Sequence, residues 1–89
     1  PQLEAANLIS PNSDGINDYW EIYHPERYKE FTVEIYSGSG ELIYSTTDYE
    51  NNKWDGTVHG REIPDGIYYY IVKNPTGSDV FKGIINLIN

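Results

Sequence analysis

Side chains that could ligate a cation are concentrated in residues 10–21, where carboxylate and amide oxygens alternate with small residues. Asn12, Asp14 and Asp18 stand at ligand positions of the calcium loop of helix–loop–helix proteins, and Gly15 stands at its glycine. The first position lacks the expected aspartate, and the flanks read as strands, which misplaces the closing glutamate. Two interpretations stay open: a strand-flanked calcium loop, or an Asx-rich turn whose side chains bond their own backbone. We favour the turn and assign no metal site.

The residues of the chain do not form a pattern typical of an enzyme. Its two histidines, His24 and His59, both lie in polar stretches, and it has no Cys. A hydrolase needs a nucleophile and a base within reach of each other, and no GxSxG elbow, HExxH helix or phosphate-binding loop is present. We therefore predict no enzymatic activity, no catalytic residue and no cofactor.

Four large aromatic residues suggest a third kind of site, because exposed rings on a β-sandwich can stack on sugars. These residues are Trp20, Trp54, Tyr68 and Tyr70. A small domain needs large rings in its interior, and large aromatic side chains are usually buried. We therefore expect core or corner positions for all four.

Length and charge limit the class of protein. The chain has 89 residues, the size of one small domain with a thin core. Its net charge of −8 disfavours nucleic acid and anionic membrane surfaces as partners. Without Cys, the fold rests on packing and turns and not on disulfides. No apolar run approaches the roughly 18 residues of a membrane span, so we expect no membrane insertion.

Several segments alternate apolar with polar residues, or form short β-branched and aromatic runs, between turn formers. The predicted strands are residues 7–9, 19–23, 31–35, 41–45, 67–72 and 80–88. One helical turn is predicted over 24–30, beginning at a proline, and a polar connection over 46–53. This spacing predicts an all-β fold, an Ig-like antiparallel β-sandwich of about seven strands. Residues 1–6 read as the end of a linker, and residues 7–89 as the Ig-like domain.

The stretch from residue 52 to 72 carries the most specific turn chemistry. Trp-Asp-Gly at 54–56 begins a compact turn, with Trp54 as the anchor beneath it. Pro-Asp-Gly at 64–66 predicts a second turn, because Pro presets φ and Gly accepts a positive φ. Tyr68 has the spacing of a tyrosine corner, in which the Tyr hydroxyl bonds to an upstream backbone group.

The last predicted strand is uncharged after Lys82. Its alternation places Phe81, Gly83, Ile85 and Leu87 on one face. An uncovered edge of such a strand would favour pairing with a strand of another chain.

Four segments, in this order, resemble the type B C-terminal sorting domain of type IX secretion cargo, also called the gliding motility-associated C-terminal domain. They are ISPNSDGINDYWEI (9–22), FTVEIYSGSGELIY (31–44), YENNKWDGT with GREIPDGIYYYIV (49–57 and 60–72), and FKGIINLIN (81–89). The resemblance covers nearly the whole chain, from about residue 6 to residue 88.

The chain departs from the family pattern in three places. The hairpin loop at 37–40 reads Ser-Gly-Ser-Gly, where the family usually has an Arg and an aromatic residue. Ser13 replaces the usual Gly, and Asn89 stands where Arg or Lys is frequent. The Ig-like part of flagellar hook-capping proteins shares the WDG and PxGxY segment but lacks the acidic opening, so that resemblance ranks second.

The resemblance implies a sorting signal and not a reaction. The domain would direct a larger exported protein, with its upstream cargo domains, through the type IX secretion system. The cargo would be in the periplasm in transit, and then at the cell surface or secreted. The implied partners are the outer-membrane translocon and a PorP/SprF-like protein. The alternative is a calcium-dependent adhesive or sugar-binding Ig-like surface module.

Ordered loops on a rigid scaffold often carry recognition. We therefore predict that the acidic loop (residues 10–18) and the two turns at 54–56 and 64–66 contact the partner. The predicted partner-recognition residues are Pro11, Asn12, Asp14, Gly15, Asn17, Asp18, Trp54, Asp55, Gly56, Pro64 and Gly66.

Overall fold

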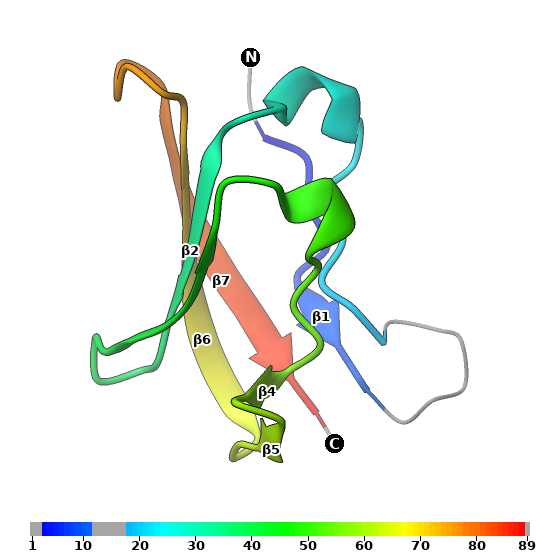
Figure 1. Ribbon diagram of the computed structural model, residues 1–89. Coiled ribbons are helices and arrows are strands. Elements are labelled where there is room, and N and C mark those ends of the chain that lie inside the picture. The colour runs from blue at the N-terminus through cyan, green and yellow to red at the C-terminus, as the bar shows by residue number, and fades with distance from the viewer. Residues whose placement is uncertain (1–2, 12–17, 89) are drawn as a thin grey trace.

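The computed structural model describes residues 3–11 and 18–88, and the chain within them is all-β, apart from two short 3-10 helices (Figure 1). One five-stranded sheet has the order β1-β7-β6-β2-β3, and a separate hairpin pairs β4 with β5. The strands are β1 (Leu8–Ile9), β2 (Thr32–Tyr36), β3 (Leu42–Thr46), β4 (Thr57–Val58), β5 (Arg61–Glu62), β6 (Gly66–Lys73) and β7 (Val80–Leu87). The helices are η1 (Pro25–Tyr28) and η2 (Tyr49–Asn51).

The long strands follow the alternation of the sequence. In β2, Val33 and Ile35 are buried, while the other three residues of the strand are partly exposed. β6 and β7 pair antiparallel in unbroken register from Gly66 opposite Leu87 to Lys73 opposite Val80. Only β1 runs parallel to its neighbour, β7, among the described pairings of this sheet. The predicted Ig-like sandwich is thus built around β2, β6 and β7.

The second layer of the sandwich is mostly irregular chain. Ala5 and Ile22 form an isolated antiparallel bridge, and the N–H of Trp20 donates to the carbonyl of Trp54 at 3.0 Å. Both 3-10 helices lie on this side of the sheet (Figure 1). Neither described helix is long and apolar enough to cross a membrane.

One sequence-based assignment in this layer is wrong, and another is incomplete. Residues 19–23 do not form a strand, because their main-chain bonds go to two different segments. Trp20 bonds to Trp54, whereas the N–H of Tyr23 bonds to the carbonyl of Glu4 at 2.8 Å. The connection at 46–53 is also structured, since it contains η2 and buries Tyr49. The helical turn predicted over 24–30 is confirmed as η1, with its proline at the start.

The core lies between the sheet and this second layer. Its largest members are Trp20 and Trp54, which are 0% and 1% exposed. The other buried apolar side chains are Ile9, Ile22, Val33, Ile35, Tyr49, Tyr68, Val72, Ile85 and Leu87. The prediction that large rings fill the interior is confirmed for Trp20, Trp54 and Tyr68, and Tyr70 is partly buried against the core. The rings of Trp20, Trp54 and Tyr68 are therefore not available as a sugar-stacking surface.

Gly83 in β7 provides the space for one of these rings. It lies opposite Tyr70 of β6, and a β-carbon at position 83 would come 2.5 Å from Cζ of Tyr70. The Tyr70 ring, in turn, packs on Trp20, with ring centroids 4.7 Å apart. Gly83 thus leaves room for the Tyr70 ring, and that ring connects the sheet to Trp20 in the second layer.

We expect Gly83→Ala to lower the free energy of unfolding by about 1–3 kcal/mol, the usual cost of overpacking a core. The Tyr70 ring would have to leave its contact with Trp20. Urea unfolding followed by tryptophan fluorescence measures the change. Gly38→Ala is the control, because its added β-carbon meets only the carbonyl of Ile67 at 3.5 Å. Equal midpoints for the two variants would contradict the packing argument.

Candidate partner-recognition surface

The Trp-Asp-Gly turn is closed by its own side chains. Oδ1 of Asp55 accepts hydrogen bonds from the backbone N–H of Thr57 at 3.1 Å and from its hydroxyl at 2.6 Å. The indole N–H of Trp54 donates to the carbonyl of Thr57 at 3.0 Å. Gly56 has φ 83°, a conformation that favours glycine. Asp55 therefore has a clear structural role as the acceptor of an Asx turn.

Gly56 is also the point where three distant segments meet. A β-carbon there would lie 3.1 Å from Cδ1 of Leu87, at the end of β7, and 3.1 Å from Cγ of Pro11. The residue is buried. The contact places the start of the acidic loop beside the Trp-Asp-Gly turn and the last residue of β7.

The Pro-Asp-Gly turn leads into β6 through the predicted tyrosine corner. The hydroxyl of Tyr68 donates to the carbonyl of Pro64 at 2.6 Å, which confirms that prediction. The Tyr68 ring meets Trp54 edge to face, with centroids 5.9 Å apart. Burial, and then the nearby Asp65 carboxylate, raise the pKa of Tyr68, so the hydroxyl stays a neutral donor. The two turns are thus fixed to each other through Trp54 and Tyr68.

Tyr49 fixes the position of the Trp-Asp-Gly turn, and the sequence analysis did not predict this role. Its hydroxyl donates to the carbonyl of Trp20 at 2.8 Å and accepts from the N–H of Trp54 at 2.8 Å. Its ring also meets Trp20 edge to face at 5.5 Å. Tyr49 lies in a polar run without apolar periodicity, so no pattern marked it as buried.

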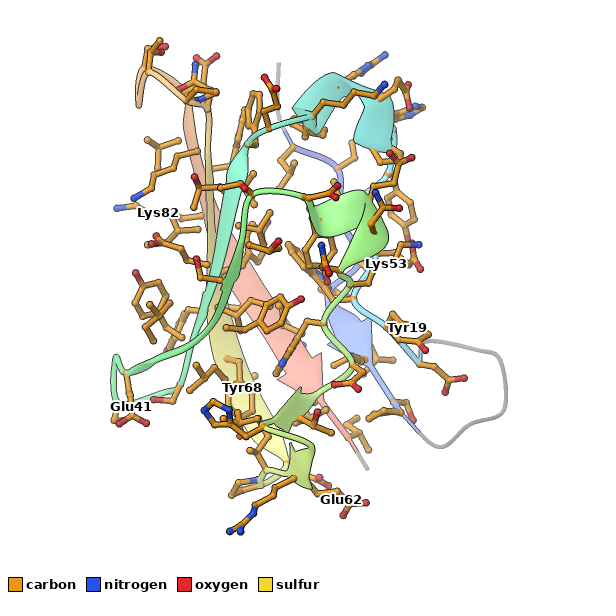
Figure 2. The ribbon with its side chains drawn as sticks, in the orientation of Figure 1. Tyr19, Glu41, Lys53, Glu62, Tyr68 and Lys82 are labelled. Carbon is orange, nitrogen blue, oxygen red and sulfur yellow. The ribbon has the colours of Figure 1, made fainter. Side chains whose placement is uncertain are left out.

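The structure brings part of the predicted recognition set together at one end of the sandwich, which we call the turn end. It consists of Pro11, the turn at 54–56, the β4–β5 hairpin and the turn at 64–66. Figure 1 shows β4, β5 and the C-terminus at this end, and Figure 2 shows Tyr68 and Glu62 there.

The predicted residues at the turn end differ in exposure. Asp55, Pro64 and Gly66 are exposed, whereas Trp54 and Gly56 are buried and position the turn from inside. Asp18 is described and is partly buried. Asn12, Asp14, Gly15 and Asn17 lie outside the described residues.

The exposed side chains of the turn end suit recognition by charge and shape. Arg61 and Glu62 of β5 are exposed, and so are Asp55 and Asp65 in the two turns of this end. Within residues 3–11 and 18–88, no three of His, Asp and Glu gather where they could hold a metal ion. The open calcium interpretation depends on Asn12 and Asp14, outside that part of the chain.

A cleft lies between the two 3-10 helices, and none of the described residues predicted for recognition lines it. This cleft has a volume of about 430 Å³ and reaches the core at Ile22, Val33 and Tyr49. Lys29 and Lys53 are among the residues that line it, and Lys53 pairs with Glu21 at 3.0 Å. Among the described residues the second layer has no full sheet, and irregular chain leaves this cleft open, which no local sequence pattern predicted.

The fold is that of a small Ig-like domain. The chain belongs to the CHU_C type IX secretion signal domain family, whose family model matches residues 3–87. It is therefore a signal domain for type IX secretion, and this is not a family of enzymes. The same role implies export to the cell surface or the medium. No curated protein matches the chain.

A solved structure supports the fold independently. The chain is similar to part of PorZ, described as an essential bacterial surface component of the type IX secretion system of Porphyromonas gingivalis. The TM-score is 0.70 at 20% sequence identity, and the match covers 98% of this chain but 11% of that chain. The chain thus spans a small part of the length of that protein, and the likeness concerns the fold.

We expect Tyr49→Phe to lower the free energy of unfolding by about 1–3 kcal/mol, because the N–H of Trp54 and the carbonyl of Trp20 lose their buried partner. Thermal unfolding measures the loss. Tyr19→Phe is the control, since that side chain is 50% exposed.

The pH dependence gives a second readout of the same variant. Burial raises the pKa of the Tyr49 hydroxyl above its ordinary value. As the pH rises, the unfolded chain therefore loses this proton at a lower pH than the folded chain does. Stability from this group is complete below about pH 10 and declines above it. Unfolding curves taken on both sides of that pH should show a smaller decline for Tyr49→Phe than for the parent chain. An equal decline would contradict the role of Tyr49.

Proposed function

We propose that the folded domain is the signal itself, read in the periplasm and passed to the outer-membrane translocon with the help of a PorP/SprF-like partner. In this proposal it directs a larger exported protein, with its upstream cargo domains, to the cell surface or the medium. The turn end is the surface that the machinery contacts.

The observation that carries the proposal is the meeting of Pro11, Gly56 and Leu87. These residues are far apart in the sequence and come together only in the folded domain. The turn at 64–66 joins them through the contact of Tyr68 with Trp54. A partner that binds the turn end would therefore recognise folded cargo and not an extended tail.

The calcium-dependent adhesive module is the alternative. It requires that the acidic loop bind calcium and that the domain bind a ligand outside the cell. A melting temperature that rises with added calcium, together with a passenger that is not exported, would favour it over the sorting role.

The test is to fuse residues 1–89 to a fluorescent passenger with an inner-membrane signal, in a host with an intact type IX system. We expect the passenger outside the cell, and its loss from the medium and surface when the translocon is deleted. A passenger that stays in the periplasm would contradict the sorting role of the domain.

Paired alanine variants then test the turn end. Arg61→Ala with Glu62→Ala removes one exposed charge of each sign at this end, with no change in net charge. We expect export to fall about tenfold, the scale of losing a contact of ~1.4 kcal/mol. Glu26→Ala with Arg27→Ala is the matched control, because η1 lies at the opposite end of the molecule (Figure 1). Equal export of both pairs, at equal stability, would exclude this part of the surface.

A further inference from the structure

One side of β7 has unused main-chain hydrogen-bonding groups. The N–H of Asn86 donates to the carbonyl of Asn7 at 2.8 Å, and that of Ile88 to Ile9 at 3.0 Å. The register with β6 is unbroken, so Val80, Lys82 and Ile84 present their N–H and C=O groups on this same side. Only Asn86 and Leu87 pair with β1. Within the described chain, residues 80–85 have no main-chain partner there.

This open edge has one of the usual protections against pairing, the charge of Lys82, and lacks the others. Natural edges carry bulges, prolines, charged side chains or a very short strand. β7 has eight residues, no proline and one charge, Lys82. β3, at the other edge of the sheet, has five residues and a register shift opposite Ile35 and Tyr36. A bulge twists an edge away from new partners, so β7 is the better template of the two.

The outer face of the sheet beside this edge is apolar. Tyr69 and Ile84 lie opposite each other there and are 44% and 46% exposed. They form part of a shallow apolar hollow with Tyr36 and Ile71. Val80, at the start of the strand, is also 46% exposed. The open main-chain edge and the apolar face therefore meet along β7.

Lys82 is the one charged side chain that lines this hollow, and it lies between Val80 and Ile84 on the outer side. Figure 2 shows it pointing away from the molecule. No ion pair of Lys82 occurs among the described residues, whereas Lys73 on the same face pairs with Glu34 at 3.4 Å. A cation without a counter-charge on an apolar strand favours an acidic residue in the partner.

A second copy of this chain fits the edge poorly. In a symmetric antiparallel pairing of two β7 strands centred on position 82, the two Lys82 side chains would face each other, and like charges directly opposite are destabilising. Each chain also carries a net charge of −8, which opposes association of identical copies.

We propose that β7 docks an extended strand of a partner protein whose outward side chains read apolar, acidic, apolar. The acidic residue lies opposite Lys82, and the apolar residues lie opposite Val80 and Ile84, because directly opposed residues share one face of a sheet. The pattern is symmetric, so a parallel and an antiparallel strand both satisfy it. The inference deepens the proposed function and rests on it in one respect, that the domain is handed to a protein partner.

The first test titrates the isotopically labelled domain with the capped peptide Thr-Val-Thr-Asp-Thr-Val-Thr. We expect the amide signals of Val80, Lys82 and Ile84 to shift, while those of β3 stay in place. Shifts confined to β3, absence of shifts, or concentration-dependent self-association through β7 without peptide would each overturn the proposal.

A charge exchange tests the chemistry of the pattern. Lys82→Glu should weaken binding of this peptide by about fivefold, and the peptide with Lys in place of Asp should regain the loss. Equal affinity of both peptides for both proteins would overturn the assignment of an acidic residue. Because Lys82 is exposed, we expect Lys82→Glu to leave the melting temperature unchanged, and measuring it checks that the variant folds.

A backbone variant tests strand addition. Ile84→Pro removes an N–H that points to the open edge and breaks no hydrogen bond within the described sheet. We expect it to abolish peptide binding.

The fusion assay keeps the two proposals separate. Export that depends on the translocon but is unchanged by Lys82→Glu and Ile84→Pro overturns the docking edge and leaves the sorting role. Peptide binding at β7 by a domain whose fusion is not exported overturns the sorting role and leaves the docking edge.

Discussion

The structure depends on the hydrogen-bonded contact between Trp20, Trp54 and Tyr49. A single five-stranded sheet has an apolar inner face, and a chain of 89 residues provides no second full sheet among its described residues to cover it. Two indole rings and a phenol provide much of that cover instead. Backbone groups in irregular chain need partners outside a strand ladder. The Tyr49 hydroxyl supplies one for the carbonyl of Trp20 and one for the N–H of Trp54. This arrangement lets a thin domain remain closed without disulfides.

The same arrangement explains why the turn end suits a signal domain. Trp54 belongs both to the core and to the Trp-Asp-Gly turn, so the shape of the turn is fixed by the packing of the whole domain. Gly56 then lets Pro11 and Leu87 approach the turn. A surface built in this way is absent from an unfolded chain. A partner that binds this surface, as proposed, would distinguish a folded signal domain from an unfolded one.

The irregular second layer also leaves parts of the sheet available. Because the chain before β1 bridges to Ile22 and not to β7, most of the β7 edge is uncovered. The cleft between the 3-10 helices has the same origin. The turn end and the β7 edge are distinct surfaces, so the two proposed contacts do not compete for the same residues.

The sequence alone determined what depends on local chemistry. Alternation located β2 and β7, and a β-branched and aromatic run located β6. Turn formers located the turns at 37–40 and 64–66, but the β4–β5 hairpin was not predicted. The spacing before Tyr68 predicted its bond to the chain upstream, now seen at Pro64. These features are set by residues close in sequence, which a linear pattern can reveal. Only the tertiary structure decided the burial of Tyr49 and the loss of the strand at 19–23. It also decided which strand edge stays open. Each of these depends on contacts between segments tens of residues apart, as between Tyr49 and Trp20 or Pro11 and Gly56, and no local pattern encodes such contacts.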